Sequence, residues 1–141
     1  MALGLKYLHE EKQILHRDIK PANILWYDGG RIKITDFNHA IELEKLIEFN
    51  WRGNVGTPWF KAPELLLDLK YSFGIDVWAL GCVFEHLLTQ QFIFRFDANA
   101  KKGVNYNQNQ NLIAIFRKLG IPSGTNWASI AEFDRLKKPE Y

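Results

Sequence analysis

The sequence predicts a mainly α-helical domain with one small β-hairpin, and three features carry this prediction. Residues 72–88 form an apolar run of helical length, and apolar residues recur at helical spacing within 112–119. One pair of strand candidates, 24–27 and 31–35, is joined by the turn residues 28–30. Long helices and few strands together indicate a helical architecture.

The first part of the chain is predicted to begin with a helix. Apolar residues recur at helical spacing from residue 1 to about 12, which predicts an amphipathic helix. Residues 13–15 follow as a short extended piece, and 16–23 are polar without periodicity, which indicates a loop. Residues 36–63 are predicted to be irregular because glycine and proline recur there.

The two helices in the second half of the chain are predicted to differ in burial. The helix at 72–88 is apolar nearly all round, as expected of a helix buried inside a domain. The helix that ends near Leu119 is striped and should stop at Gly120 and Pro122. The polar tract 105–111 between them is expected to be an exposed loop.

Composition limits the class of protein. Of the 141 residues, 47% are hydrophobic and 24% are charged, which suits one globular domain. The net charge of +2 gives no reason to expect a nucleic-acid or membrane partner. The most apolar stretch, 75–88, carries charges and is too short for a membrane span. The single Cys82 should be a buried, inert thiol, which favours an intracellular protein of the cytoplasm or nucleus.

One combined pattern of residues points to chemistry. Its parts are His16-Arg17-Asp18-Ile19-Lys20-Pro21-Ala22-Asn23, Asp36-Phe37-Asn38, Gly56-Thr57, Ala62-Pro63-Glu64 and Asp76-Val77-Trp78. Phosphoryl transfer needs an acceptor for the proton of the attacking hydroxyl, metal ions that neutralise the phosphates, and a nearby cation. The pattern resembles the catalytic loop, metal-binding motif and activation segment of eukaryotic-type serine/threonine protein kinases.

The resemblance implies that ATP and Mg²⁺ are the cofactors and that a protein hydroxyl accepts the phosphoryl group. Asp18 would orient the substrate hydroxyl and accept its proton, Lys20 would lie by the γ-phosphate, and Thr57 would hydrogen-bond to both. Asn23 and Asp36 would supply oxygen ligands to Mg²⁺.

Other matching positions are expected to support the site. Leu25 is placed like the residue under the adenine ring, and His16 and Phe37 look like members of a hydrophobic stack that aligns the site. Asp76 would hold the catalytic loop through backbone N–H groups, which are unfavourable to bury unpaired. Lys20 is typical of the serine/threonine class and not of the tyrosine class.

A branch of the family is also indicated. Residues 56–67 and 115–122 look like the branch that contains cyclin-dependent, mitogen-activated and casein kinase II-like enzymes. Lys61 stands where proline-directed members have an arginine, and Gly56 replaces a bulkier residue. We therefore expect a preference for an acidic residue, and not for proline, after the phosphorylated residue.

The resemblance covers residues 1–141 as one partial catalytic domain. It implies a kinase-like C-lobe that lacks the N-lobe and the final helices, since no Gly-rich loop precedes Met1 and the arginine that pairs with Glu64 in the family would follow Tyr141. We expect the chain alone to be inactive, and poorly soluble or loosely packed.

Asn38 departs from the family, which usually has glycine there. A glycine at this place allows backbone torsions that most residues avoid. Asparagine is the residue that best tolerates positive φ after glycine, so we expect metal binding to survive.

Arg17 belongs to the kinases that pair this arginine with a phosphorylated residue, yet 37–56 contains no serine, threonine or tyrosine. We expect a carboxylate to replace the phosphate, and activity without phosphorylation in this segment. The alternative is that the acidic residues form a solvated loop face. The candidate carboxylates and the aromatic residues that would pin the segment are Glu42, Glu44, Glu48, Phe49 and Trp51.

Two other functions remain open. A small-molecule phosphotransferase of the antibiotic-kinase type has a similar acidic core, but Lys20, Thr57 and Ala62-Pro63-Glu64 build a peptide-docking segment that small substrates do not need. A non-catalytic kinase-like interaction module, either a pseudokinase or a truncated gene product, is the second. For a kinase, the expected partners are a protein substrate and a regulatory subunit.

Overall fold

A computed structural model of the chain describes residues 1–48, 55–94, 108–122 and 127. The helices are α1 (Ala2–Lys6) with a π-helical turn (Tyr7–Glu11), α2 (Leu43–Glu48), α3 (Pro63–Leu66), α4 (Gly74–Thr89) and α5 (Gln108–Leu119). The strands are β1 (Ile14–Leu15), β2 (Ile24–Tyr27), β3 (Arg31–Ile34) and β4 (Ile41–Glu42). The mainly helical prediction with its small hairpin is confirmed.

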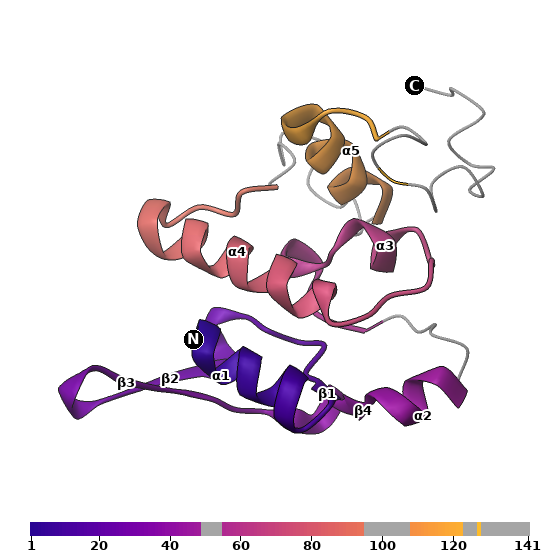
Figure 1. The fold of residues 1–141 in the computed structure, drawn as a ribbon. Helices are drawn as coiled ribbons and strands as arrows, with labels where there is room; N and C mark the ends of the chain where they lie inside the picture. The colour runs from indigo at the N-terminus through magenta and orange to yellow at the C-terminus, as the bar shows by residue number, and fades with distance from the viewer. Residues whose placement is uncertain (49–54, 95–107, 123–126, 128–141) are drawn as a thin grey trace.

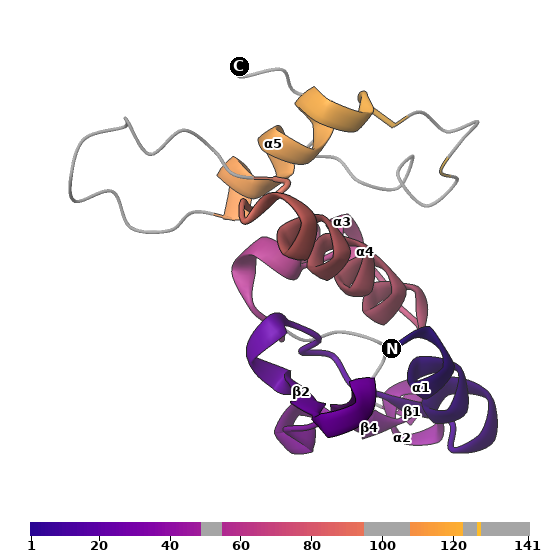
Figure 2. The ribbon, with the colours of Figure 1, turned by 90° about the vertical axis from the view of Figure 1, so that its left-hand side faces the viewer.

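The helix α4 crosses the middle of the molecule (Figure 1). On one side lie α1, the β2–β3 hairpin, the β1–β4 pair and α2, and on the other side lies α5. The view turned by 90° shows the same order of layers, with α3 beside α4 (Figure 2). Within the described ranges, no helix is long and apolar enough to cross a membrane.

The hairpin has the predicted strands and turn. Its antiparallel register pairs Ile24 with Ile34 and Tyr27 with Arg31. The turn between the strands places Gly29 at φ 78° and Gly30 at φ 76°, a left-handed backbone that glycine adopts without strain. Because Ile24 and Ile34 lie opposite each other, the hairpin brings the segments before β2 and after β3 side by side.

The prediction that 36–63 is irregular is wrong in part. Ile41 and Glu42 form β4, which pairs antiparallel with β1, and α2 follows directly. Leu46 of α2 is fully buried. Neighbouring residues give no clear signal for either element. β4 is held by pairing with β1, which is far away in the sequence, and α2 has a single buried residue, Leu46.

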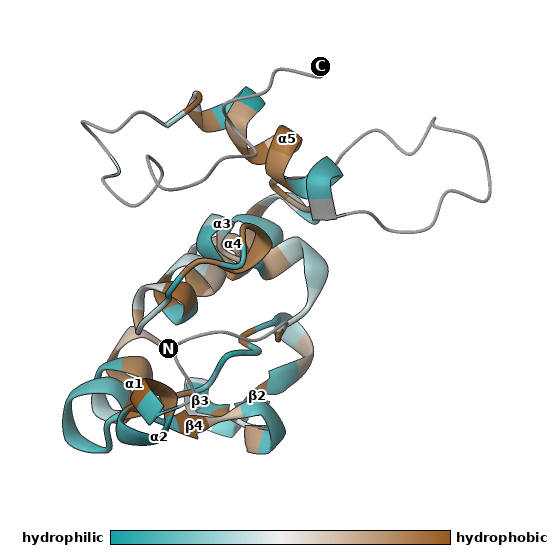
Figure 3. Cartoon of the chain, turned by 90° about the vertical axis from the view of Figure 1, so that its right-hand side faces the viewer, coloured by the Kyte–Doolittle hydropathy of each residue, from teal (hydrophilic) through white to brown (hydrophobic). Residues whose placement is uncertain are grey.

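The helix α4 was expected to be buried all round, and this is wrong for one face. Its buried residues include Ile75, Ala79 and Val83, which pack into the core. On the opposite side Phe84 is 48% exposed and Leu88 is 83% exposed. Figure 3 colours parts of α4 as hydrophobic. Phe84 and Leu88 lie one helical turn apart, so these exposed residues form an apolar ridge.

This ridge predicts how the isolated polypeptide behaves. We expect Phe84→Gln with Leu88→Gln to raise the fraction of the 141-residue polypeptide that stays in solution after ultracentrifugation, because less apolar surface remains exposed. The melting temperature should change by no more than about 4 °C. The control Val83→Gln, at a fully buried position of the same helix, should unfold the chain. Equal solubility of the double variant and the wild type would contradict the interpretation.

The expected loop at 105–111 is corrected at its second half. Residues 108–111 form the first turn of α5, whereas 105–107 lie outside the described residues. The side chain of Asn111 is buried, and its Nδ2 donates to the carbonyl of Pro58. A polar tract can therefore begin a helix here, because its buried amide has a partner from a distant segment. The predicted stop after Leu119 is confirmed, with Gly120 at φ 87°.

Candidate active site

One buried carboxylate, that of Asp76, holds the start of the loop of residues 16–23. Asp76, in the first turn of α4, is only 1% exposed. It accepts hydrogen bonds from the backbone N–H of His16 (2.8 Å) and of Arg17 (2.8 Å). The expectation that Asp76 holds the loop through backbone N–H groups is confirmed.

His9 is a third partner of Asp76 that sequence reasoning missed. Its Nε2 lies 2.9 Å from the carboxylate, and its ring stacks on Phe73 with centroids 4.6 Å apart. The contact joins the helix that ends near Lys12 to α4. No local signal reveals it, since a lone histidine on a helix is usually a packing residue.

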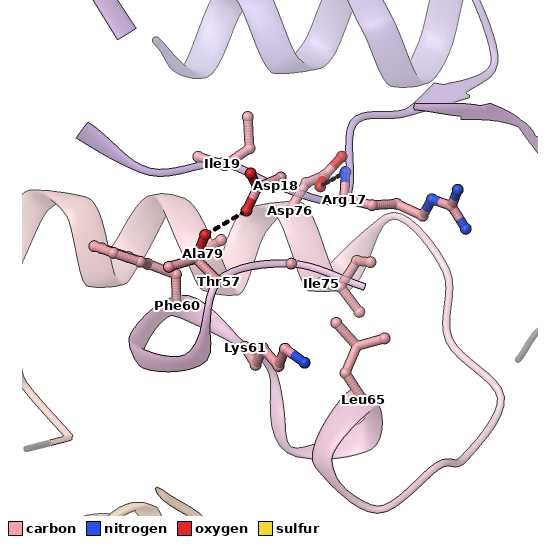
Figure 4. A pocket seen from close by; sticks show the side chains of 11 residues that line it. Arg17, Asp18, Ile19, Thr57, Phe60, Lys61, Leu65, Ile75, Asp76 and Ala79 are labelled. Atoms are coloured by element: carbon pink, nitrogen blue, oxygen red, sulfur yellow. Dashed lines mark hydrogen bonds between the residues drawn. The ribbon is translucent and has the colours of Figure 1, made fainter. Parts of the chain in front are cut away.

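Asp18 lies at the centre of a compact polar cluster with Lys20 and Thr57. The Nζ of Lys20 is 2.7 Å from one carboxylate oxygen of Asp18, and the Thr57 hydroxyl donates to the other at 2.7 Å. The same Nζ donates to the Thr57 hydroxyl oxygen at 3.1 Å. Figure 4 shows Thr57 reaching Asp18 across the chain from the segment before α3. The structure thus brings all three predicted catalytic residues together.

The surroundings keep Asp18 ionised. Burial would raise the pKa of this carboxyl group, but hydrogen bonds from Lys20 and Thr57 and the positive charge of Lys20 outweigh burial and hold the pKa below its ordinary value. A carboxylate with a lowered pKa stays ionised, so it still accepts hydrogen bonds, but it is a weak base. Asp18 is therefore suited to orienting a hydroxyl group more than to removing its proton early.

Asn23 and Asp36 are brought close by the hairpin. Asn23 directly precedes β2 and is buried, while Asp36 follows β3 and is exposed. The backbone carbonyl of Asn23 accepts a hydrogen bond from the N–H of Thr35 at 2.9 Å. The Asn23 amide nitrogen donates to the carbonyl of Asp18 at 2.8 Å, which turns its Oδ1 to the opposite side.

These two residues fit a magnesium ion by their chemistry. One amide oxygen and one exposed carboxylate are hard ligands, and Mg²⁺ uses few protein ligands because it keeps several waters. Asp36 has a left-handed backbone with φ 63°, which turns the chain sharply after the hairpin.

The reasoning about Asn38 is corrected. Asn38 lies inside the 3₁₀ turn Phe37–His39 and is not among the residues with positive φ, whereas Asp36 is. The tolerance of asparagine for positive φ is therefore not needed at position 38. The left-handed residue is the predicted metal ligand itself.

The other predicted supporting residues lie around the same loop. The rings of His16 and Phe37 contact edge to face at 4.9 Å, which agrees with the expected stack. Leu25 lies on β2 opposite Lys33 and is 42% exposed, so its side chain is accessible to a ligand. Its role under an adenine ring stays a prediction.

The expectation that a glutamate pairs with Arg17 is wrong in this structure. The Arg17 guanidinium donates to the carbonyl of His39 at 2.5 Å and to the hydroxyl of Tyr71 at 3.1 Å. Glu42 pairs instead with Lys45 at 3.0 Å, and the side chains of Glu44 and Glu48 are exposed. Phe49 and Trp51, expected to pin the segment, lie outside the described residues.

Lys61 is buried beside the catalytic cluster. It lines a small cavity together with Asp18, Thr57 and Phe60 (Figure 4). Only 7% of Lys61 is exposed. Burial lowers the pKa of Lys61, and the negative charge of Asp18 partly opposes this.

Cys82 of α4 lies in the hydrophobic core, away from this cluster. Burial raises the pKa of its thiol to about 12, which agrees with an inert thiol.

Comparison with known proteins identifies the family. The profile of the protein kinase domain matches residues 1–136. The serine/threonine-protein kinase SSN3 of Coccidioides immitis is 38% identical over 143 aligned residues, which cover 95% of this chain and 30% of that protein. The cyclin-dependent kinase E-1 of Arabidopsis thaliana is 42% identical over 133 aligned residues, covering 90% of this chain and 28% of that protein.

A solved structure agrees in fold. The CAK complex of Chaetomium thermophilum bound to ATP-γ-S contains a chain that superposes with a TM-score of 0.77 at 27% identity, covering 99% of this chain and 40% of that one. The chain thus spans less than two fifths of the length of the curated relatives named above. The profile match covers almost the whole chain, the relatives include kinases of the cyclin-dependent type, and the fold matches that of a chain in the solved CAK complex. This chain therefore belongs to the protein kinase family.

Proposed function

We propose that the natural protein containing this chain transfers the γ-phosphoryl group of ATP to a serine or threonine hydroxyl of a protein. Residues 1–141 would form the helical-lobe part of its catalytic domain. The observation that carries the proposal is the Asp18–Lys20–Thr57 cluster, in which a carboxylate, a cation and a hydroxyl from two distant segments meet within 3.1 Å.

The residues divide the work of phosphoryl transfer. Asp18 accepts a hydrogen bond from the incoming hydroxyl and receives its proton as the new oxygen–phosphorus bond forms and the bond from the γ-phosphorus to the bridging oxygen breaks, which releases ADP. Lys20 places positive charge where the γ-phosphoryl group gathers negative charge. Asn23 and Asp36 would hold Mg²⁺, which neutralises the phosphates when bound, and Leu25 would contact the adenine.

The alternative is a non-catalytic interaction module. The retained cluster around Asp18 favours catalysis for the natural protein. For the 141-residue polypeptide by itself we propose little activity, since it spans only 30% of a full-length relative. The relative in the CAK complex was solved as an assembly, which supports a regulatory subunit as partner. We propose an intracellular location, in the nucleus or cytoplasm.

The test is phosphoamino-acid analysis. The natural protein is incubated with Mg²⁺, γ-labelled ATP and a mixture of serine-, threonine- and tyrosine-containing peptides. We expect label on serine or threonine, and none with Thr57→Val, because the cluster loses its hydroxyl. Label on tyrosine alone would contradict the class, and no transfer to any peptide would favour the interaction module.

Substrate choice gives a further prediction about Lys61. We expect a preference for an acidic residue directly after the phosphorylated residue, because the buried ammonium group attracts a carboxylate strongly where water is scarce. Since burial lowers the pKa of Lys61, the preference should weaken as pH rises toward that pKa and the lysine loses its charge. A peptide array read at several pH values measures this.

Two variants sharpen the specificity test. Lys61→Met should remove the acidic preference and leave transfer to neutral peptides, whereas the exposed-lysine control Lys45→Met should keep it. A strong requirement for proline in the wild type would contradict the prediction.

A further inference from the structure

We infer that the buried hydroxyl of Tyr71 is a positioning group for the catalytic loop, which holds the guanidinium of Arg17 and thereby the backbone that presents Asp18. The inference rests on the proposed kinase function. Tyr71 belongs to none of the motifs that mark the site in the sequence.

Arg17 has a backbone conformation that its neighbours must maintain. Its φ of 67° is left-handed, which is uncommon for a residue with a side chain and persists only where surrounding contacts fix it. The N–H of Arg17 donates to Asp76 at 2.8 Å. The side chain is held separately, by Tyr71 and by the carbonyl of His39. Asp18 is the next residue, so any rotation of the Arg17 backbone moves the Asp18 carboxylate.

Tyr71 is a rigid anchor because its ring is part of the core. Only 3% of the residue is exposed, and it packs in the cluster that contains Leu15, Leu46 and Ile75. Leu15 directly precedes the loop, and Ile75 precedes Asp76. The stretch from Tyr71 to Asp76 therefore holds Arg17 twice, by its backbone at one end and by its guanidinium at the other.

The hydroxyl has a specific chemical task at this place. Among residues 1–48, 55–94, 108–122 and 127, no carboxylate lies within ion-pair distance of the Arg17 guanidinium, and its acceptors are a phenol oxygen and a peptide carbonyl. A hydrogen bond from a charged donor is stronger than one between neutral groups. The phenol oxygen can therefore hold the guanidinium in place where a phosphate group would otherwise do so. Figure 4 shows the Arg17 side chain extending away from the Asp18 carboxylate, and Arg17 also contributes to the lining of the small cavity beside Asp18.

The test compares Tyr71→Phe with the wild type in the natural protein, since phenylalanine keeps the ring and removes only the oxygen. We expect kcat to fall about tenfold, which corresponds to about 1.4 kcal/mol. KM for ATP should not change, because the Arg17 guanidinium bonds to His39 and Tyr71 and to neither of the proposed metal ligands, Asn23 and Asp36. Tyr7→Phe, at a half-exposed tyrosine of the first helix, is the control and should keep full kcat.

A double-mutant cycle separates positioning from a general loss of stability. In an Arg17→Gln background, Tyr71→Phe should cause no further fall in kcat, because its partner is already absent. An unchanged kcat in Tyr71→Phe, an equal fall in both backgrounds, or failure of Tyr71→Phe to fold would each overturn the inference. If the wild type transfers no phosphate, the proposed function fails. The same cycle read on the urea midpoint then tests the Arg17–Tyr71 contact, and additive shifts would overturn it.

Discussion

Asp18→Asn in the natural protein should lower kcat for peptide phosphorylation by about 10³-fold, within the range that a positioned general base contributes. Asparagine keeps the shape of the side chain and can still bond to Thr57. It loses the negative charge that Lys20 faces and the site that receives the proton. The expected change is therefore in the chemical step and not in folding, and steady-state kinetics with a serine peptide measures it.

A matched control is available in the hairpin turn. Asp28 is exposed, and Asp28→Asn removes one carboxylate in the same way without touching the cluster. Its kcat should equal that of the wild type. If Asp18→Asn kept more than about a tenth of the activity, far above what loss of a positioned base leaves, the assignment of Asp18 would fail.

Asp76→Asn should strongly destabilise the fold. The carboxylate is 1% exposed and accepts hydrogen bonds from two backbone N–H groups and from His9. An amide would turn its own N–H donors toward groups that also donate, leaving buried donors unpaired. We expect the free energy of unfolding to fall by about 3–5 kcal/mol, as when one partner of a buried ionic contact is removed.

Urea denaturation measures this loss. The control Asp68→Asn changes an exposed aspartate with φ 54°, a conformation that asparagine adopts readily, and should lie within about 0.5 kcal/mol of the wild type. A loss of less than about 1 kcal/mol for Asp76→Asn would show that water or rearranged backbone satisfies the loop.

Elements whose signal is local were predicted well. The first helix, the hairpin with its Gly29-Gly30 turn and the stop of α5 at Gly120 each depend on neighbouring residues. The elements that were missed depend on distant contacts. β4 forms because β1 pairs with it. The polar residues 108–111 can form the first turn of α5 because the buried amide of Asn111 donates to the carbonyl of Pro58.

In the candidate site, too, the residues of the motif were predicted well and a contact from a distant segment was missed. The motif predicted that Asp18, Lys20 and Thr57 would meet, since a resemblance over the whole motif carries three-dimensional information that spacing lacks. The partner of Arg17 was predicted wrongly, because charge alone favoured a glutamate. The actual acceptor, Tyr71, is fixed by core packing, which charge patterns along a sequence do not report.

The most direct test of the central claim is the binding of Mg-ATP by two aspartate variants of the natural protein, measured by isothermal titration calorimetry. Asp18 is assigned to the substrate hydroxyl and Asp36 to the metal. The account predicts that Asp18→Asn binds Mg-ATP with the wild-type dissociation constant, whereas Asp36→Asn loses measurable binding. Equal binding by both variants, or loss of binding in Asp18→Asn alone, would contradict it.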